Sequence, residues 1–260
     1  MSTIGKALTL LDAISRLEKE AGLSDIARHC GLDKATARRF LVELEKHGFV
    51  EQDVETRRYR LGGAPVRLAR IREARFPYLS VATPFARELA SLAGETVHLS
   101  EYAAGRLSTI HVEDSQRAHR VIVDVGSILP FHATASGLGF LAFCPQKEID
   151  AALSAPLQAF TDHTLTDPAA LRQTLGETLR RGYSICHHGL ETGVVSVAAP
   201  IRAPGTTPVG AIAIAAPATR ADKETVEQMG RAAMAAARRI SERLFGLEQV
   251  AADPLARRAG

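Results

Sequence analysis

The alternation of apolar and polar positions is most regular between Leu23 and Val50, where it predicts two short helices joined by a tight turn. Ser24 is a suitable N-cap for the first helix, Gly31 ends that helix, and Asp33 can cap the second one. In the second helix, apolar side chains recur at i, i+3, i+4 and i+7 and form one buried stripe: Ala37, Phe40, Leu41 and Leu44. The opposite face keeps small and cationic side chains.

That polar face is typical of the recognition helix in a helix-turn-helix motif. Cationic side chains contact phosphates, and small side chains near the helix N-terminus allow a close approach to base edges. The residues assigned to DNA here are Ser24, Lys34, Ala35, Thr36, Arg38 and Arg39. The pattern alone leaves an alternative, which is an ordinary helical hairpin with a solvated basic face.

The residues after the second helix favour DNA binding. Residues 49–52 and 57–61 have the composition of two short strands around the polar turn 53–56. Arg58 and Arg60 share one face of the returning strand, where they can lie along a phosphate backbone. The sequence therefore predicts a winged helix-turn-helix domain over residues 1–62, completed by a first helix at 4–19.

A separate helix is predicted over residues 63–76. Its apolar side, which includes Leu68 and Ile71, is too narrow for a domain core and too regular for a flexible tether. The same helix of a second subunit could cover this apolar side, so we expect a linker helix that dimerises the protein. The alternative is a solvated spacer.

Residues 77–248 have the pattern of an α+β domain with a mainly antiparallel sheet. Pro77 and Pro84 are expected to bracket a helix boundary, and the helix 85–93 should end at Gly94. Strands are predicted at 96–102, 107–113, 120–125, 183–186, 194–201 and 209–215, and further helices at 146–153, 169–181 and 222–245. The tail 249–260 is expected to fray.

Charge is distributed unevenly along the 260 residues. Residues 1–75 carry 15 Lys and Arg against 11 Asp and Glu, whereas the remainder carries 17 against 18, so the positive excess lies where DNA is expected. Three widely spaced cysteines argue against a disulfide framework and for a reducing compartment. With no signal-peptide pattern and no apolar run of about 20 residues, we expect a soluble cytoplasmic protein that does not meet a membrane.

Several motifs occur together in a characteristic order. They are GKALTLLDAI at Gly5, LSDIARHCGLDKATARRFLVELEKHGFVEQD at Leu23, GETVHLS at Gly94, LPFHATASG at Leu129, RRGYS at Arg180 and GVVSVAAPI at Gly193. In this the chain resembles the IclR family of bacterial transcription regulators. The resemblance implies a winged helix-turn-helix, a dimerising linker helix and a GAF-like effector domain. It also implies dimers or tetramers on palindromic double-stranded operators and a small organic effector, often a carboxylic acid from a catabolic pathway, with no cofactor.

The family's effector site carries over to Thr134, Ala135, Ser136, Cys186, Val194, Ser196, Ala213 and Ala215, and we add Val121 as a wall. A loop of small residues before a helix offers amides that can hold an anion. Many relatives have an acidic run where this chain reads CHHG from Cys186, and several have serines in place of Ala213 and Ala215. These departures favour an effector with a less polar body, aromatic ones included.

Two other functions use the same domain. Ser136 with His98, His111 or His132 suggests a nucleophile and base, but Ser136 lacks the second glycine of a G-x-S-x-G elbow and no acid is evidently paired with a histidine. Cys186 and His188 lie two apart, on one side of a strand, and suggest a metal sensor, but two ligands do not make a tetrahedral site. We therefore expect neither an enzyme nor a metal site.

Overall fold

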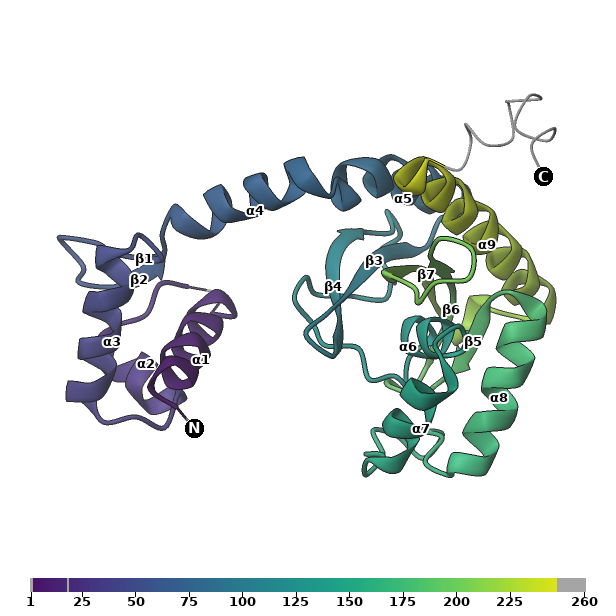
Figure 1. The fold of residues 1–260 in the computed structure, drawn as a ribbon, viewed down its shortest axis with the longest axis horizontal. Coiled ribbons are helices and arrows are strands. Elements are labelled where there is room, and N and C mark those ends of the chain that lie inside the picture. The colour runs from purple at the N-terminus through teal and green to yellow at the C-terminus, as the bar shows by residue number, and fades with distance from the viewer. Residues whose placement is uncertain (1, 18, 247–260) are drawn as a thin grey trace, which may run out of the picture. The chain divides into compact units, whose positions relative to one another are not determined.

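The computed structural model describes residues 2–17 and 19–246 (Figure 1). The chain divides into two compact units, Met1–Phe76 and Pro77–Gly260. No helix in the described part of the chain is long and apolar enough to cross a membrane. The tail that we expected to fray lies outside the described residues.

The first unit is the predicted winged helix-turn-helix. Its elements are α1 (Thr3–Ser15), α2 (Leu23–His29), α3 (Lys34–Lys46), β1 (Val50–Gln52), β2 (Tyr59–Leu61) and α4 (Ala64–Arg75). The helices bury one small core with the hairpin, built on Leu10, Ile14, Ile26, Ala27, Ala37, Phe40, Leu41, Val50 and Tyr59. The two strands pair antiparallel and place Glu51 opposite Arg60.

Local chemistry at the turn agrees with the sequence except at Ser24. Gly31 adopts φ +63 just after α2, and the Asp33 side chain accepts a hydrogen bond from the Thr36 amide, so the predicted end of α2 and the predicted cap of α3 are confirmed. The prediction that Ser24 caps α2 is wrong, because the N-cap is Gly22 and makes no side-chain cap. Ser24 lies inside the first turn, and its side chain is exposed.

A helix is present where one was predicted over residues 63–76, and it is α4. Within it, Val66, Leu68 and Ile71 are 57%, 45% and 46% exposed, so their apolar surface is largely uncovered in the single chain.

The second unit is built on a five-stranded antiparallel sheet in the order β4-β3-β7-β6-β5. Its strands are β3 (Thr96–Ala103), β4 (Arg106–Glu113), β5 (Ser184–His187), β6 (Val194–Ile201) and β7 (Gly210–Pro217). Its helices are α5 (Tyr78–Ala93), α6 (Ala135–Leu141), α7 (Gln146–Ser154), α8 (Pro168–Arg181), the short 3-10 turn η1 (Ala218–Arg220) and α9 (Lys223–Phe245). Helices α5 and α9 pack together on one face of the sheet, and α6 lies on the other (Figure 1). The predicted α+β class is confirmed.

Two sequence predictions fail in this unit. Helix α5 continues through Pro84 instead of beginning after it, since the loss of one amide is outweighed by the buried face that carries Phe85, Ala86 and Leu89. Residues 120–125 form no strand. Ile122 and Val125 are 72% and 65% exposed there, and the chain pairs with β4 only from Gly126 onward.

Candidate functional site

The exposed face of α3 carries the side chains that were assigned to DNA. Lys34, Ala35, Arg38 and Arg39 are exposed, while Thr36 is half-buried. A shallow depression along this face is lined by Leu23, Lys34, Ala35, Arg38, Arg39, Val42 and Glu43. Val42 was missed, and its 38% exposure gives the face an apolar contact in the second half of the helix.

The wing brings Arg58 and Arg60 close to Glu20. Arg60 Nη1 lies 3.2 Å from Glu20 Oε1 and its Nε lies 3.3 Å from Glu51 Oε2, while Arg58 Nη1 donates to the Glu20 carbonyl over 3.1 Å. Because Arg60 and its partners are about half exposed, these contacts are weak and can be exchanged for phosphates.

The second unit contains a partly open cavity of about 170 Å³. Its walls come from the N-terminus of α6, the strands β3, β6 and β7, and the segments 121–129 and 189–191. Every residue predicted for the effector site lines it except Ala213. The predicted lining is therefore Val121, Thr134, Ala135, Ser136, Cys186, Val194, Ser196 and Ala215.

Ala213 belongs to the core instead. It is fully buried, pairs with Ala198 in the sheet and belongs to the same buried cluster as the α6 residues Leu138 and Phe140. Helix α6 approaches the sheet here so closely that a Cβ on Gly139 would lie 3.2 Å from the Ala198 carbonyl oxygen. The helix thus covers Ala213 and leaves Ala215 facing the cavity.

The N-terminus of α6 forms the floor of the cavity. Thr134 caps it, because its Oγ1 accepts from the Gly137 amide and donates to the Pro130 carbonyl, both over 2.9 Å. The amides of Ala135 and Ser136, in the first turn, have no carbonyl partner within the helix. Gly137 is required, since a Cβ there would lie 2.5 Å from Phe131 Cα and from the Pro130 oxygen.

The wall beside this floor holds a buried polar pair. His98 Nε2 lies 3.1 Å from Ser136 Oγ, and the two residues are 6% and 1% exposed. Burial lowers the pKa of His98 to about 4, so the imidazole is neutral at pH 7. Sequence analysis had considered His98 only as a base, although its alternation with Val97 and Leu99 already placed it on the opposite face of the strand from them.

Both parts of the chain match models of one family. Residues 3–54 match the IclR helix-turn-helix domain, and residues 74–242 match the bacterial transcriptional regulator IclR C-terminal domain. This chain belongs to the IclR family. It is a DNA-binding transcriptional regulator, as the resemblance implied.

Relatives of the IclR-family chain cover most of its length. The glycerol operon regulatory protein of Streptomyces coelicolor is 34% identical over 230 residues, which are 86% of this chain and 88% of that protein. The transcriptional repressor IclR of Escherichia coli is 27% identical over 93% of this chain and 89% of its own. These relatives are regulators of transcription.

Two solved IclR structures show the same fold. A transcriptional regulator of Silicibacter sp. TM1040 superposes with a TM-score of 0.80 at 41% identity, over 94% of this chain and 96% of its own. An IclR homolog of Microbacterium hydrocarbonoxydans, solved in complex with 4-hydroxybenzoate, gives a TM-score of 0.81 at 26% identity, over 94% and 100%.

The side chains considered for catalysis and metal binding mostly point elsewhere. His111 pairs with Glu113 over 2.9 Å, and His132 Nε2 lies 2.8 Å from the Gln158 carbonyl oxygen. His188 lies beyond the end of β5 at φ +57, where its Nδ1 accepts a hydrogen bond from the Gly193 amide. The prediction that it shares a strand face with Cys186 is therefore wrong. No three His, Cys, Asp or Glu residues of the described chain are grouped to hold a metal ion.

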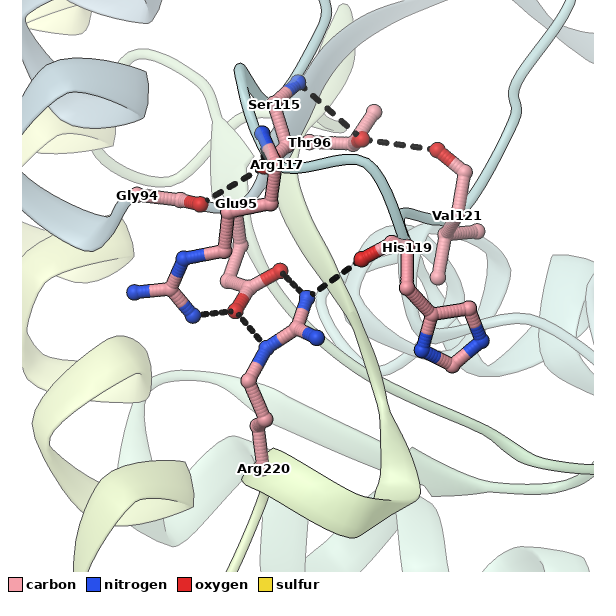
Figure 2. A network of polar contacts seen from close by, with 8 residues as sticks. All are labelled: Gly94, Glu95, Thr96, Ser115, Arg117, His119, Val121 and Arg220. Carbon is pink, nitrogen blue, oxygen red and sulfur yellow. Dashed lines mark hydrogen bonds and ion pairs between the residues drawn. The ribbon is translucent and has the colours of Figure 1, made fainter.

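One wall of the IclR-family pocket is anchored from outside by a buried carboxylate (Figure 2). Glu95, whose side chain is 4% exposed, accepts from Arg117 Nη1 over 2.6 Å and from two nitrogens of Arg220. Arg220 also donates to the His119 carbonyl, and Thr96 Oγ1 donates to the Val121 carbonyl over 2.7 Å. These contacts fix residues 119–121, where the pocket-lining segment begins.

Proposed function

We propose that this regulator changes its operator affinity when a small organic acid from a catabolic pathway occupies the pocket beside α6. The observation that carries the proposal is that the cavity is lined by the residues to which the family's effector site was carried over. The family member solved with 4-hydroxybenzoate supports an acid of this size as the ligand class.

The cavity restricts the size of the ligand. A volume of about 170 Å³ is close to the roughly 150 Å³ of an engineered protein cavity that binds benzene, so it suits a compact acid. The floor offers the Ala135 and Ser136 amides for a carboxylate. Val121, Ile128, Leu129 and Val194 offer an apolar wall for the body of the acid, whether aliphatic or aromatic.

On DNA, we propose a homodimer, or a dimer of dimers, that places two recognition helices on a palindromic operator. One winged domain makes few base contacts, so two half-sites held one or two helical turns apart are needed for specificity. The uncovered apolar side of α4 supplies a self-complementary contact through Leu68 and Ile71. A coupling of about 1 to 3 kcal/mol between acid and operator changes operator affinity about 5- to 150-fold, and the operator must change acid affinity equally.

Filling the cavity tests the acid site. Calorimetry measures the binding of pyruvate, benzoate and 4-hydroxybenzoate to the natural chain and to the variant Ala135→Trp. The variant should bind none of these acids, and its operator affinity should not change when an acid is added. Because Ala135 is almost fully buried, Val194→Phe provides a second variant that fills the cavity from its edge. Leu92→Trp, at a 75% exposed position on α5, is the control of equal bulk. Undiminished acid binding by both filled variants would place the effector elsewhere.

A further inference from the structure

The cavity contains a buried polar pair, His98 and Ser136, that the proposed contacts of the acid with backbone amides and an apolar wall do not explain. His98 and Ser136 face each other at 3.1 Å, and within the described chain His98 Nδ1 has no hydrogen-bond partner. Such unpaired buried atoms are uncommon and call for an explanation. The pair lies where the carboxylate of a bound acid would lie, beside the first turn of α6.

We propose that His98 and Ser136 form the acid-recognising end of this pocket and that a carboxylate binds there together with one proton, which the imidazole takes up. The inference rests on the proposed function, because it concerns how the same pocket holds its acid. It adds a residue that the carried-over site does not contain and a chemical requirement on the ligand.

The charges around the cavity create the need for that proton. Among the residues described, no lysine or arginine lines the cavity, whereas Asp124 and Glu191 do. An anion that leaves water for this site gains no opposite charge and meets two like charges. His98 is the one basic side chain that the lining offers, so protonation of its ring is the available compensation.

Apart from the exposed carboxylates of Asp124 and Glu191 at the cavity, the described strands place no charged side chain on the face of the sheet that carries His98. Its neighbours across the sheet are Val112 on β4 and Ala213 on β7, and β6 and β7 carry no titratable side chain. His111 and Glu113 of β4 pair across from Leu99 and Val97 and therefore lie on the other face. Cys186 of β5 also lines the cavity, but burial raises the pKa of its thiol, which stays neutral.

The proton balance is simple. In the proposed free state the neutral ring carries its hydrogen on Nε2, which donates to Ser136 Oγ, and the unpaired Nδ1 keeps its lone pair. When the acid binds as its anion, one proton from solvent adds to Nδ1, while Nε2–H continues to donate to Oγ. The Ser136 hydrogen then turns to a carboxylate oxygen. An anion beside the ring raises the pKa of His98 from its low starting value of about 4.

Calorimetry can count this proton. Titration of the natural chain with benzoate in phosphate and in Bis-Tris, which both buffer in this range but differ in ionisation enthalpy, should show uptake of about one proton per benzoate between pH 6 and 7. Over that interval the apparent Kd should rise by up to about tenfold, because a proton is a second ligand of the same complex. Neutral benzamide should show no uptake.

Variants separate a role in binding from a role in folding. His98→Gln keeps a group that can bond to Ser136 but cannot gain charge, so proton uptake and pH dependence should vanish while thermal unfolding stays cooperative. Ser136→Ala should weaken benzoate about tenfold and leave benzamide unaffected. His132→Gln, which alters a histidine outside the cavity lining, should behave as the natural chain does.

The outcomes distinguish this inference from the proposal beneath it. Binding of benzoate without proton uptake, and with the same pH dependence in His98→Gln, would overturn the inference and leave the effector pocket standing. Failure of pyruvate, benzoate and 4-hydroxybenzoate to bind the natural chain would overturn both.

Discussion

Glu95 and Arg220 form a two-point ion pair across 125 residues of sequence, with Nε–Oε1 at 2.7 Å and Nη2–Oε2 at 2.8 Å. The carboxylate is buried directly before β3, and the guanidinium comes from η1, directly after β7. Since Arg220 also holds the His119 carbonyl, one side chain connects the sheet to the segment that leads into the pocket.

Replacement of Arg220 tests this connection. Arg220→Met should lower the free energy of unfolding by about 2 to 3 kcal/mol, because Glu95 stays buried with Arg117 as its remaining partner. Acid affinity should fall as well, since residues 119–121 lose an anchor. Arg172→Met, which breaks an exposed pair with Asp150, should cost less than about 1 kcal/mol and leave acid binding unchanged. Denaturant unfolding and calorimetry measure both effects.

Substitution of an arginine on α3 and of one on the wing should change DNA binding in different ways. Arg38→Ala should relax base preference, because Arg38 lies on the exposed face of α3. Arg58→Ala should weaken all sequences alike and reduce the slope of log K against log salt by about one unit. Binding assays at several salt concentrations measure this slope, and an unchanged slope for Arg58→Ala would remove the wing from the interface.

Charge on α4 should separate the subunits. Leu68→Glu combined with Ile71→Glu places two carboxylates on the face that we assign to the dimer, so the variant should sediment as a monomer and lose operator affinity. Val66→Glu is the matched control, since Val66 is similarly exposed but lies on the opposite side of the same helix. A double variant that still sediments as a dimer would show that the contact lies elsewhere.

The two alanines of β7 should respond differently to a hydroxyl. Ala215→Ser adds a polar group to the cavity wall and should shift preference from benzoate toward smaller, more polar acids such as pyruvate. Ala213→Ser puts the same group into the packed core, so it should cost about 1 to 3 kcal/mol of stability and leave the ratio of acid affinities unchanged. Competition calorimetry measures the ratio of benzoate to pyruvate affinity in each variant. An equal change of this ratio in both variants would contradict the placement of Ala215 in the cavity wall and Ala213 in the core.

Periodicity predicted most of the fold because most elements bury one regular face. The stripe from Ala37 to Leu41 places α3, and the span Val194–Ile201 is β6 as expected. It failed at residues 120–125, where alternating β-branched side chains have the composition of a strand. A strand also needs a neighbour with unpaired backbone groups, and a single sequence does not identify one.

The pocket was predicted from resemblance more than from pattern. The resemblance assigned both Ala213 and Ala215 to the pocket, but they lie about 7 Å apart along β7, and which of them α6 covers depends on tertiary packing. The partnership of His98 with Ser136 joins residues 38 apart. The sequence predicts the polar face of β3 that carries His98, but it does not predict that Ser136 of α6 lies against that face.

The cavity has two kinds of wall, and their residues differ in how far they can be substituted without affecting the fold. On the sheet side, Ser196 and Ala215 pair with each other in the ladder, so substitution there also acts on the fold. On the other side, Val121, Ile122 and Val123 lie in an irregular segment that contributes no strand. On the function proposed above, substitutions at residues 121–124 can therefore change which acid the pocket accepts without changing the strands of the sheet.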